Sequence, residues 1–212
     1  LTKFFSKTDQ IEKSLMSSPL QIEANIDTLF LEEAYQIGIT LEEQLSLYKP
    51  HSLLNTINKN AGVQSTQVPS HLIPLFSLAK KIAHVSYGAY DPTIGVFSQK
   101  CYGFGLKKAK IPSKTALEKQ KKFVNYHYLI VDESGVFLKE RGMILDLGGI
   151  AKGFAVSQMM QHLQKKGATK ALINLGGEIL CIGKKYTIGI AHPRENRLLT
   201  TITTSKEMTS IS

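Results

Sequence analysis

The sequence predicts an α+β protein with a mixed sheet. Apolar and polar residues alternate over residues 20–26, which is typical of a half-buried strand. Apolar residues recur every three to four positions over residues 30–47 and again over 151–163, which indicates two amphipathic helices. Because the predicted helices and strands do not alternate regularly along the chain, the pattern favours the α+β class.

The composition is that of an ordinary globular protein. The chain has 212 residues, of which 42% are hydrophobic and 20% charged, enough for one large domain or two small ones. No stretch approaches the ~18 uninterrupted apolar residues that predict a membrane-spanning helix. The sequence starts at Leu1 rather than at a methionine, so we expect that it was cut from a longer chain, and a signal peptide or lipid anchor could have been removed.

The formal net charge of +9 raises nucleic acid or an anionic membrane as partners. The lysines are spread along the chain, with clusters at 107–108, 119–122 and 184–185, and no arginine-rich run or aromatic RNA-binding signature accompanies them. We therefore interpret them as solvated surface residues. Cys101 and Cys181 fit no metal-binding spacing and lie beside apolar residues, which favours buried thiols over a disulfide.

The N-terminal half is predicted to be mainly helical after its first strand. Residues 1–14 have no clear period and are interpreted as a tail or a loose helix. Gly38 lies inside the helix over residues 30–47 and weakens the prediction there. A short helical turn is expected over 53–58. Ser70 is expected to cap a further helix, with Pro74 in or near its first turn.

The C-terminal half is predicted to contain most of the strands. Pro112 and Ser113 introduce a short basic helix that ends near Lys122. The remaining predictions are a hairpin of 126–131 with 135–138, a strand over 171–175, a hairpin of 179–182 with 186–190, and a Thr- and Ser-rich final segment over 198–212.

Residues 143–153 form a candidate anion-binding site. Residues 143–145 form a short apolar strand that ends in Asp146, and Gly148 and Gly149 follow before a helix that has Lys152 in its first turn. A strand-glycine-helix junction leaves backbone N–H groups at the positive end of a helix, which suits a phosphate or pyrophosphate. An ordinary connection with glycines for close packing and an ion pair explains the same pattern equally well. The glycines run GGxxxG, which is not the GxGxxG dinucleotide fingerprint.

Six separated segments, in order and at the right spacing, together resemble the ApbE family of FAD:protein FMN transferases. The resemblance covers residues 15–212 and rests on these segments: Leu45 to Ser52, Ala89-Tyr90-Asp91-Pro92-Thr93-Ile94-Gly95, Tyr102-Gly103-Phe104-Gly105, Asp146 to Gly153, Asn174-Leu175-Gly176-Gly177-Glu178, and Gly189-Ile190-Ala191-His192-Pro193-Arg194. It implies a mixed α/β architecture built from T-fold-like units.

The resemblance also implies an activity. Members of the family bind FAD with Mg²⁺ and move its FMN part to a threonine hydroxyl of a partner protein, with release of AMP; some relatives instead hydrolyse FAD to FMN and AMP. The implied partners are flavoprotein subunits of membrane redox complexes outside the cytoplasmic membrane. The implied location is the periplasm, with attachment to the inner membrane as a lipoprotein.

Site residues follow from the same resemblance. The carbonyl of Gly149 would be a Mg²⁺ ligand, and His192 would be the base that takes the proton from the acceptor threonine. The residues that would contact or line FAD are Met16, Tyr48, Ala89, Tyr90, Asp91, Asp146 and Lys152. Without the resemblance, a lone histidine such as His192 is more often structural or solvated, and Met16 and Tyr90 are more often packing residues.

The sequence departs from the family pattern at its end. Family members usually continue with a Thr-Ser-Gly-Asp-Tyr segment and a later segment that supplies an Asp and a Thr as metal ligands, whereas this sequence stops at residues 209–212. We therefore expect two side-chain ligands and the last strands of the sheet to be missing. A piece of a full enzyme, a short paralogue that binds flavin without transferring it, and a fragment that cannot assemble its site all fit this departure.

Overall fold

The computed structural model describes residues 8–105, 109 and 111–212, and the chain divides into two compact units. The first unit comprises residues 1–42 and 152–212, and the second comprises residues 43–151. The division falls inside helix α1 (Thr28–Leu45) and at the start of helix α5 (Ala151–Lys165). Within the described residues, no helix combines the length and apolar character needed to cross a bilayer.

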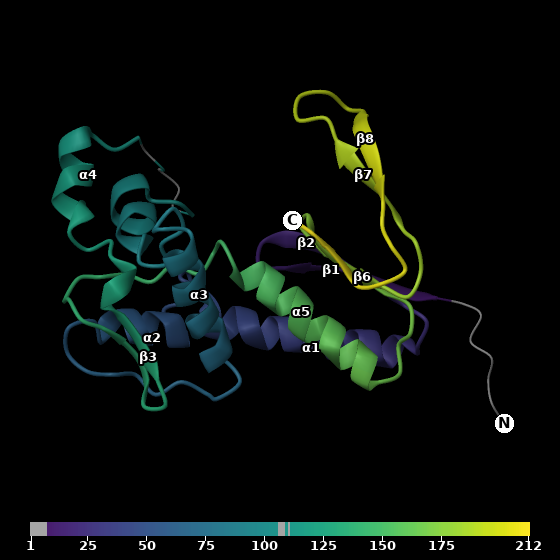
Figure 1. Ribbon diagram of the computed structural model, residues 1–212, viewed down its shortest axis with the longest axis horizontal. Helices are drawn as coiled ribbons and strands as arrows, with labels where there is room; N and C mark the ends of the chain where they lie inside the picture. The colour runs from purple at the N-terminus through teal and green to yellow at the C-terminus, as the bar shows by residue number, and fades with distance from the viewer. Residues whose placement is uncertain (1–7, 106–108, 110) are drawn as a thin grey trace. The chain divides into compact units, whose positions relative to one another are not determined.

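The first unit is built on a five-stranded sheet in the order β1-β2-β5-β6-β9 (Figure 1). Its strands are β1 (Asp9–Leu15), β2 (Ser18–Ala24), β5 (Ala171–Leu175), β6 (Glu178–Ile182) and β9 (Thr209–Ile211). All four neighbouring pairs are antiparallel, so the α+β class is confirmed, but the prediction of a mixed sheet is wrong.

Strand β1 corrects the prediction of a tail or loose helix for the part of residues 1–14 that is described. Only Ile11 and Leu15 of β1 are buried, because the strand lies at an edge of the sheet, and the sequence alternation is correspondingly weak. Met16 and Ser17, with φ of 50° and 58°, make the tight turn into β2. Neither residue is a glycine or asparagine, so the usual signal of such a turn is absent. Residues 1–7 lie outside the described part of the chain.

Helices α1 and α5 lie side by side along the sheet (Figure 1). Glu33 of α1 joins them through His162 Nε2 of α5 and Nζ of Lys166, the residue that follows α5, each 2.9 Å from Glu33 Oε2. A Cβ at Gly38 would lie 2.5 Å from Leu15 Cδ2 and 3.2 Å from Met159 Sδ. Gly38 therefore allows α1 to approach the end of β1 and α5 closely, which explains a glycine inside a helix.

The second unit consists of short helices and one hairpin. Its elements are α2 (Leu53–Lys59), α3 (Ile73–Val85), a π-helix (Val96–Tyr102), α4 (Lys114–Lys121), a 3₁₀ turn (Tyr126–Tyr128), β3 (Leu129–Asp132) and β4 (Gly135–Leu138). Helices α2 and α4 confirm their predictions. The predicted hairpin of 126–131 with 135–138 is confirmed except at its start, where residues 126–128 form the 3₁₀ turn and the strand begins at Leu129. Ser70 is not the cap of α3, because Leu72 precedes the first helical residue; Pro74 does lie in the first turn.

The end of the chain pairs differently from the prediction. Strand β6 pairs with β5 and β9, whereas β7 (Thr187–Ala191) pairs with β8 (Leu198–Thr203), so the predicted hairpin of 179–182 with 186–190 is wrong. A turn at Gly183 separates β6 from β7, and the β7–β8 hairpin stands apart from the sheet (Figure 1). Cys101 and Cys181 are buried free thiols, as predicted.

Replacing Gly183 with alanine should destabilise the first unit by about 3 kcal/mol, since a Cβ there meets both a strained backbone and a close carbonyl. Its φ is +83°, and a Cβ would lie 1.7 Å from the carbonyl oxygen of Thr169. Gly167 has a φ of +95° but nothing within 4 Å of the Cβ position. Urea denaturation should therefore show a loss of only about 1 kcal/mol for Gly167→Ala. Equal losses for the two variants would contradict the packing argument.

Candidate functional site

The loop after α3 is held by the carboxylate of Asp91. Oδ1 accepts hydrogen bonds from Thr93 N (2.8 Å) and Thr93 Oγ1 (2.6 Å), and Oδ2 accepts one from Tyr126 N (3.0 Å). Thr93 is fully buried, and its hydroxyl oxygen accepts the N–H of Asn125 at 2.8 Å. Oδ1 of Asp91 thus orders the loop itself, while Oδ2 and the Thr93 hydroxyl tie the loop to the segment before β3. Ala89, at the start of the loop, is exposed.

The segment that leads to Asp146 runs beside this loop. Asp146 N donates to Pro92 O (2.8 Å), and Gly95 N donates to Ile144 O (3.1 Å). Residues 143–145 do not form the predicted strand, because their pairing is limited to one parallel bridge between Ile94 and Ile144. The side chain of Asn58 instead bonds both backbone groups of Leu145, with Oδ1 accepting at 2.7 Å and Nδ2 donating at 3.2 Å.

Two protein donors fix the carboxylate of Asp146. Ser98 Oγ donates to Oδ2 at 2.6 Å, and Gly148 N donates to Oδ1 at 2.9 Å. Ser98 is buried in the π-helix, a rare element that often occurs at functional sites. Ser98 could not be found from the sequence, because a single serine between Phe97 and Gln99 belongs to no motif.

The glycine turn offers fewer free N–H groups than the sequence pattern indicated. Asp146 accepts the N–H of Gly148, and the carbonyl of Leu147 accepts those of Ile150 (2.9 Å) and Ala151 (2.8 Å). Gly148 and Gly149 are themselves exposed. The turn is therefore accessible to an anion, but a phosphate would have to use the remaining amides or displace these bonds.

Tyr90 lies against this turn. A Cβ at Gly149 would be 3.3 Å from Tyr90 Cε2, so the glycine leaves room for the ring. The hydroxyl of Tyr90 is buried and has no hydrogen-bond partner within the described residues. Burial, followed by the negative charges of Asp146 and Asp91, raises the pKa of Tyr90 above its usual value. The phenol therefore stays neutral and keeps an unused donor near two carboxylates.

Tyr90→Phe should raise the free energy of unfolding of the ligand-free protein by about 1 kcal/mol, because it removes a buried polar group that has no partner. The same change should weaken the binding of a ligand that accepts the hydroxyl proton. Chemical denaturation and titration with FAD measure the two effects. Lower stability together with unchanged FAD affinity would show that the hydroxyl has a structural partner.

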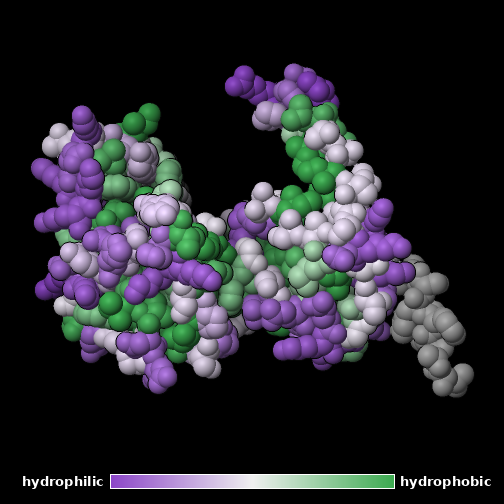
Figure 2. Space-filling view, in the orientation of Figure 1, coloured by the Kyte–Doolittle hydropathy of each residue, from purple (hydrophilic) through white to green (hydrophobic). Residues whose placement is uncertain are grey.

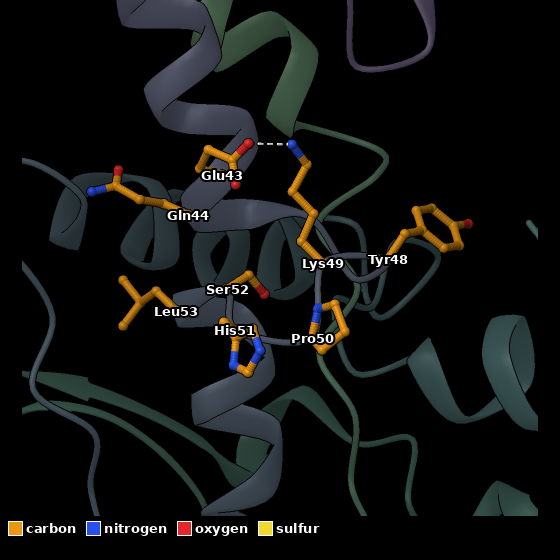
Figure 3. A pocket seen from close by; sticks show the side chains of 8 residues that line it. All are labelled: Glu43, Gln44, Tyr48, Lys49, Pro50, His51, Ser52 and Leu53. Carbon is orange, nitrogen blue, oxygen red and sulfur yellow. Dashed lines mark hydrogen bonds and ion pairs between the residues drawn. The ribbon is translucent and has the colours of Figure 1, made fainter.

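Tyr48 borders a separate hollow in the second unit (Figure 3). The hollow has a volume of about 430 Å³ and is lined by Glu43, Gln44, Tyr48, Lys49, Pro50, His51, Ser52 and Leu53. The Tyr48 ring is 59% exposed, and a Cβ at Gly105 would lie 2.2 Å from its Cε1. The ring thus packs against the Gly105 backbone. Its exposed remainder is available for stacking on a flat ligand.

Met16 and Lys152 belong to the first unit. Met16 lies in the β1–β2 turn, where its N–H donates to Glu42 Oε2 at 2.8 Å. Lys152 lies in the first turn of α5; a Cβ at Gly176 would be 3.9 Å from its Nζ and 2.7 Å from the Cβ of Ser18. The β1–β2 turn, the β5–β6 turn and the amine of Lys152 therefore gather at one end of the sheet.

His192 follows β7, in the loop of the β7–β8 hairpin. Its Nδ1 accepts the N–H of Arg194 (3.3 Å), and its Nε2 lies 3.7 Å from Glu195 Oε1. With Nδ1 accepting, the neutral ring carries its proton on Nε2, facing the carboxylate. Both contacts lie within this loop, and a base function at Nδ1 requires the Arg194 contact to open.

The second unit thus brings Tyr90, Asp91, Asp146 and Gly149 together. Tyr48 borders the separate hollow, and His192 contacts residues of its own loop. Within residues 8–105, 109 and 111–212, no group of three His, Cys, Asp or Glu side chains could hold a metal ion. A buried tyrosine, a fixed carboxylate and an exposed glycine turn suit a ligand with an aromatic ring and a phosphate.

The fold defines an α+β protein of two compact units. The chain belongs to the ApbE family, whose model matches residues 15–212. It is 30% identical over 182 residues to an FAD:protein FMN transferase of Klebsiella pneumoniae, covering 84% of this chain and 57% of that protein. It is 33% identical over 163 residues to one of Treponema pallidum, covering 74% and 45%.

Solved structures agree on the fold. The ApbE protein of Thermotoga maritima superposes with a TM-score of 0.85 at 21% identity, covering 93% of this chain and 68% of that one. The apo flavinyl transferase ApbE of Pseudomonas stutzeri gives 0.81 at 20% identity, covering 94% and 68%. The chain spans about half the length of the two curated relatives. The predicted family and fold are confirmed.

Proposed function

We propose that this protein transfers FMN from FAD to a threonine hydroxyl of an acceptor protein and releases AMP. The family match over residues 15–212 and the names of the relatives support flavin transfer. The observation that carries the proposal to this chain is the corner at which Asp146 is fixed by Ser98 and Gly148 beside the buried hydroxyl of Tyr90.

The reaction is a phosphoryl transfer. The threonine oxygen forms a bond to the phosphorus of the FMN half of the diphosphate, the bond from that phosphorus to the bridging oxygen breaks, and AMP leaves with that oxygen. The threonine proton passes to a base. Such a transfer depends on positioning and charge neutralisation more than on covalent help from the protein.

Each predicted residue has a proposed part in this reaction. Tyr90 and Tyr48 hold aromatic portions of FAD, with Met16 and Ala89 at its borders. Asp146 orders the glycine turn beside the diphosphate, and the Lys152 amine neutralises its charge. Asp91 keeps the loop of Ala89 and Tyr90 in place. His192 accepts the threonine proton once its Nδ1 is free of Arg194.

Mg²⁺ fits the described residues poorly. Mg²⁺ prefers near-octahedral oxygen ligands, usually one or two carboxylates together with water and substrate phosphates. Both oxygens of Asp146 already accept hydrogen bonds, and no cluster of three potential side-chain ligands exists in the described residues. The proposed ligand, the Gly149 carbonyl, does not complete a site by itself. The proposal of Mg²⁺ dependence rests on the family resemblance alone, and we assign no step of the reaction to the metal.

The identity of the acceptor protein and the location of the transferase are also proposals. The acceptor is proposed to be a flavoprotein subunit of a membrane redox complex, with the transferase in the periplasm and attached to the inner membrane through an N-terminal lipid anchor. The protein acceptor is supported by the relatives' name, FAD:protein FMN transferase. The complex and the location rest on the family resemblance.

A second candidate is binding or hydrolysis of FAD without transfer. The contacts of His192 within its own loop favour it, since they leave no lone pair free on the ring. Incubation with FAD and Mg²⁺, with and without a peptide of the Ser/Thr-Gly-Ala-Thr type, separates the alternatives. Transfer predicts AMP release together with acid-stable flavin on the peptide. AMP release without the peptide indicates hydrolysis, and bound FAD without AMP indicates a binding protein.

A further inference from the structure

The positive charge of the chain is concentrated in one stretch. Residues 100–122 contain eight lysines and one acidic residue, Glu118, and thus carry a net charge of +7, compared with +9 for the whole chain. This stretch contains no arginine. The net positive charge is therefore less evenly spread along the chain than the interpretation as scattered surface lysines implied.

Helix α4 presents part of this charge on an exposed face. It begins after Ser113, whose Oγ accepts the N–H of Ala116 at 3.2 Å, and none of its residues is buried. Its half-buried side holds Ala116, Leu117 and Gln120, and Cys101 Sγ lies 3.9 Å from the Ala116 carbonyl. The exposed positions of the helix carry Lys114, Lys119, Lys121 and, just past the last helical residue, Lys122, with one acidic residue, Glu118, four positions from both Lys114 and Lys122; we call the four lysines the α4 lysine face.

The α4 lysine face is available to a partner. All four lysines are exposed, and none forms an ion pair with another described residue. Hydrophilic side chains cover α4 in the space-filling view (Figure 2). Lys122 Nζ also lies 5.0 Å from the centre of the Phe123 ring. Four ammonium groups against the single negative charge of Glu118 leave an excess of positive charge that attracts an anionic partner.

An apolar side chain accompanies the lysines. Ile111, three residues before α4, is 95% exposed. A large aliphatic side chain in water beside a basic helix is the combination found at membrane interfaces, where lysines contact anionic headgroups and the apolar group enters the acyl boundary. A bilayer accepts such a group without a matching pocket. The absence of arginine, the residue best suited to bidentate phosphate contacts, makes nucleic acid a poorer fit.

We propose that the α4 lysine face and Ile111 bind the surface of an anionic phospholipid bilayer. This interaction is independent of flavin transfer, because it uses none of the proposed site residues. The lysines would hold the second unit reversibly at a membrane by contact with the headgroups, and the Ile111 side chain would insert into the apolar boundary.

The proposal is tested by co-sedimentation with vesicles of phosphatidylcholine alone and of phosphatidylcholine mixed with phosphatidylglycerol. Binding should require the anionic lipid and should weaken as NaCl rises. Neutralising three lysines in K119Q/K121Q/K122Q should lower the partition coefficient by about a hundredfold, at about fivefold for each lysine. Ile111→Ser should lower it by about tenfold, and this loss should persist at raised salt.

The matched control is K170Q/K185Q/K206Q, which removes the same charge from exposed positions of the first unit. It should bind vesicles nearly as well as the parent protein. Equal losses in the two triple variants, or equal binding to neutral vesicles, would overturn the proposal. Competition by a single-stranded oligonucleotide, with no loss on Ile111→Ser, would assign the lysine face to nucleic acid instead. Transfer to a soluble acceptor peptide should be unchanged in every variant, which separates this result from that of the proposed function.

Discussion

Replacing His192 with glutamine should lower the rate of FMN transfer by about 10²–10⁴-fold, the usual contribution of a general base. Glutamine keeps hydrogen-bonding capacity of similar size but cannot take up the threonine proton. The affinity for FAD should hardly change, because the histidine acts on the acceptor. Single-turnover labelling of an acceptor peptide measures the rate, and FAD fluorescence measures the binding.

Two comparisons make this test specific. His127, an exposed histidine of the second unit with no proposed role, provides the control, and His127→Gln should transfer FMN at the parent rate. Glu195→Gln removes the carboxylate that lies 3.7 Å from Nε2 of His192 but keeps a side chain of similar size there. We expect its rate to fall by less than that of His192→Gln. A parent rate in His192→Gln would remove His192 from the mechanism.

The sequence predicted the elements of this fold better than their pairing. The period of apolar residues identified α1, α5 and β2, because each of these elements buries one regular face. It did not reveal that β7 leaves β6 to pair with β8, because that choice depends on the turn at Gly183 and its contact with Thr169. Strand β1 was missed because an edge strand buries only two of its seven residues.

For the candidate site as well, the residues could be predicted but their contacts could not. Motif resemblance singled out Tyr90, Asp91, Asp146 and Gly149, and the structure gathers them in one unit. The resemblance could not show that the oxygens of Asp91 are fully used by Thr93 and Tyr126, or that Ser98 bonds Asp146. The bonds of Asp91 to Tyr126 and of Ser98 to Asp146 join residues that are far apart in the sequence, and only the folded chain displays them.

Asp91 offers the second large effect, since one carboxylate accepts three hydrogen bonds. Asp91→Ala should destabilise the second unit by about 3 kcal/mol, because it leaves the buried Thr93 hydroxyl and two backbone N–H groups without their acceptor. FAD binding should be lost with it, since Ala89 and Tyr90 belong to the same loop. Urea denaturation and FAD titration measure the two losses.

The control for this variant is Asp132, which makes the same local turn at an exposed position. Its Oδ1 accepts Ser134 N at 2.8 Å and Ser134 Oγ at 2.6 Å, as Asp91 does with Thr93. Asp132→Ala should leave the denaturation midpoint nearly unchanged, because water replaces the lost acceptor. A comparable destabilisation in the two alanine variants would show that the turn, and not the link to Tyr126, accounts for the effect.

Asp91→Asn separates the structural role of this residue from a direct contact with the cofactor. Asparagine keeps one oxygen for Thr93 and loses only the acceptor for Tyr126 N, so we expect a loss of about 1 kcal/mol. If Asp91 acts by holding the loop, FAD affinity should follow this small loss. A collapse of FAD affinity in a stable Asp91→Asn protein would mean that the negative charge itself contacts the ligand, through a carboxylate that must first release Tyr126.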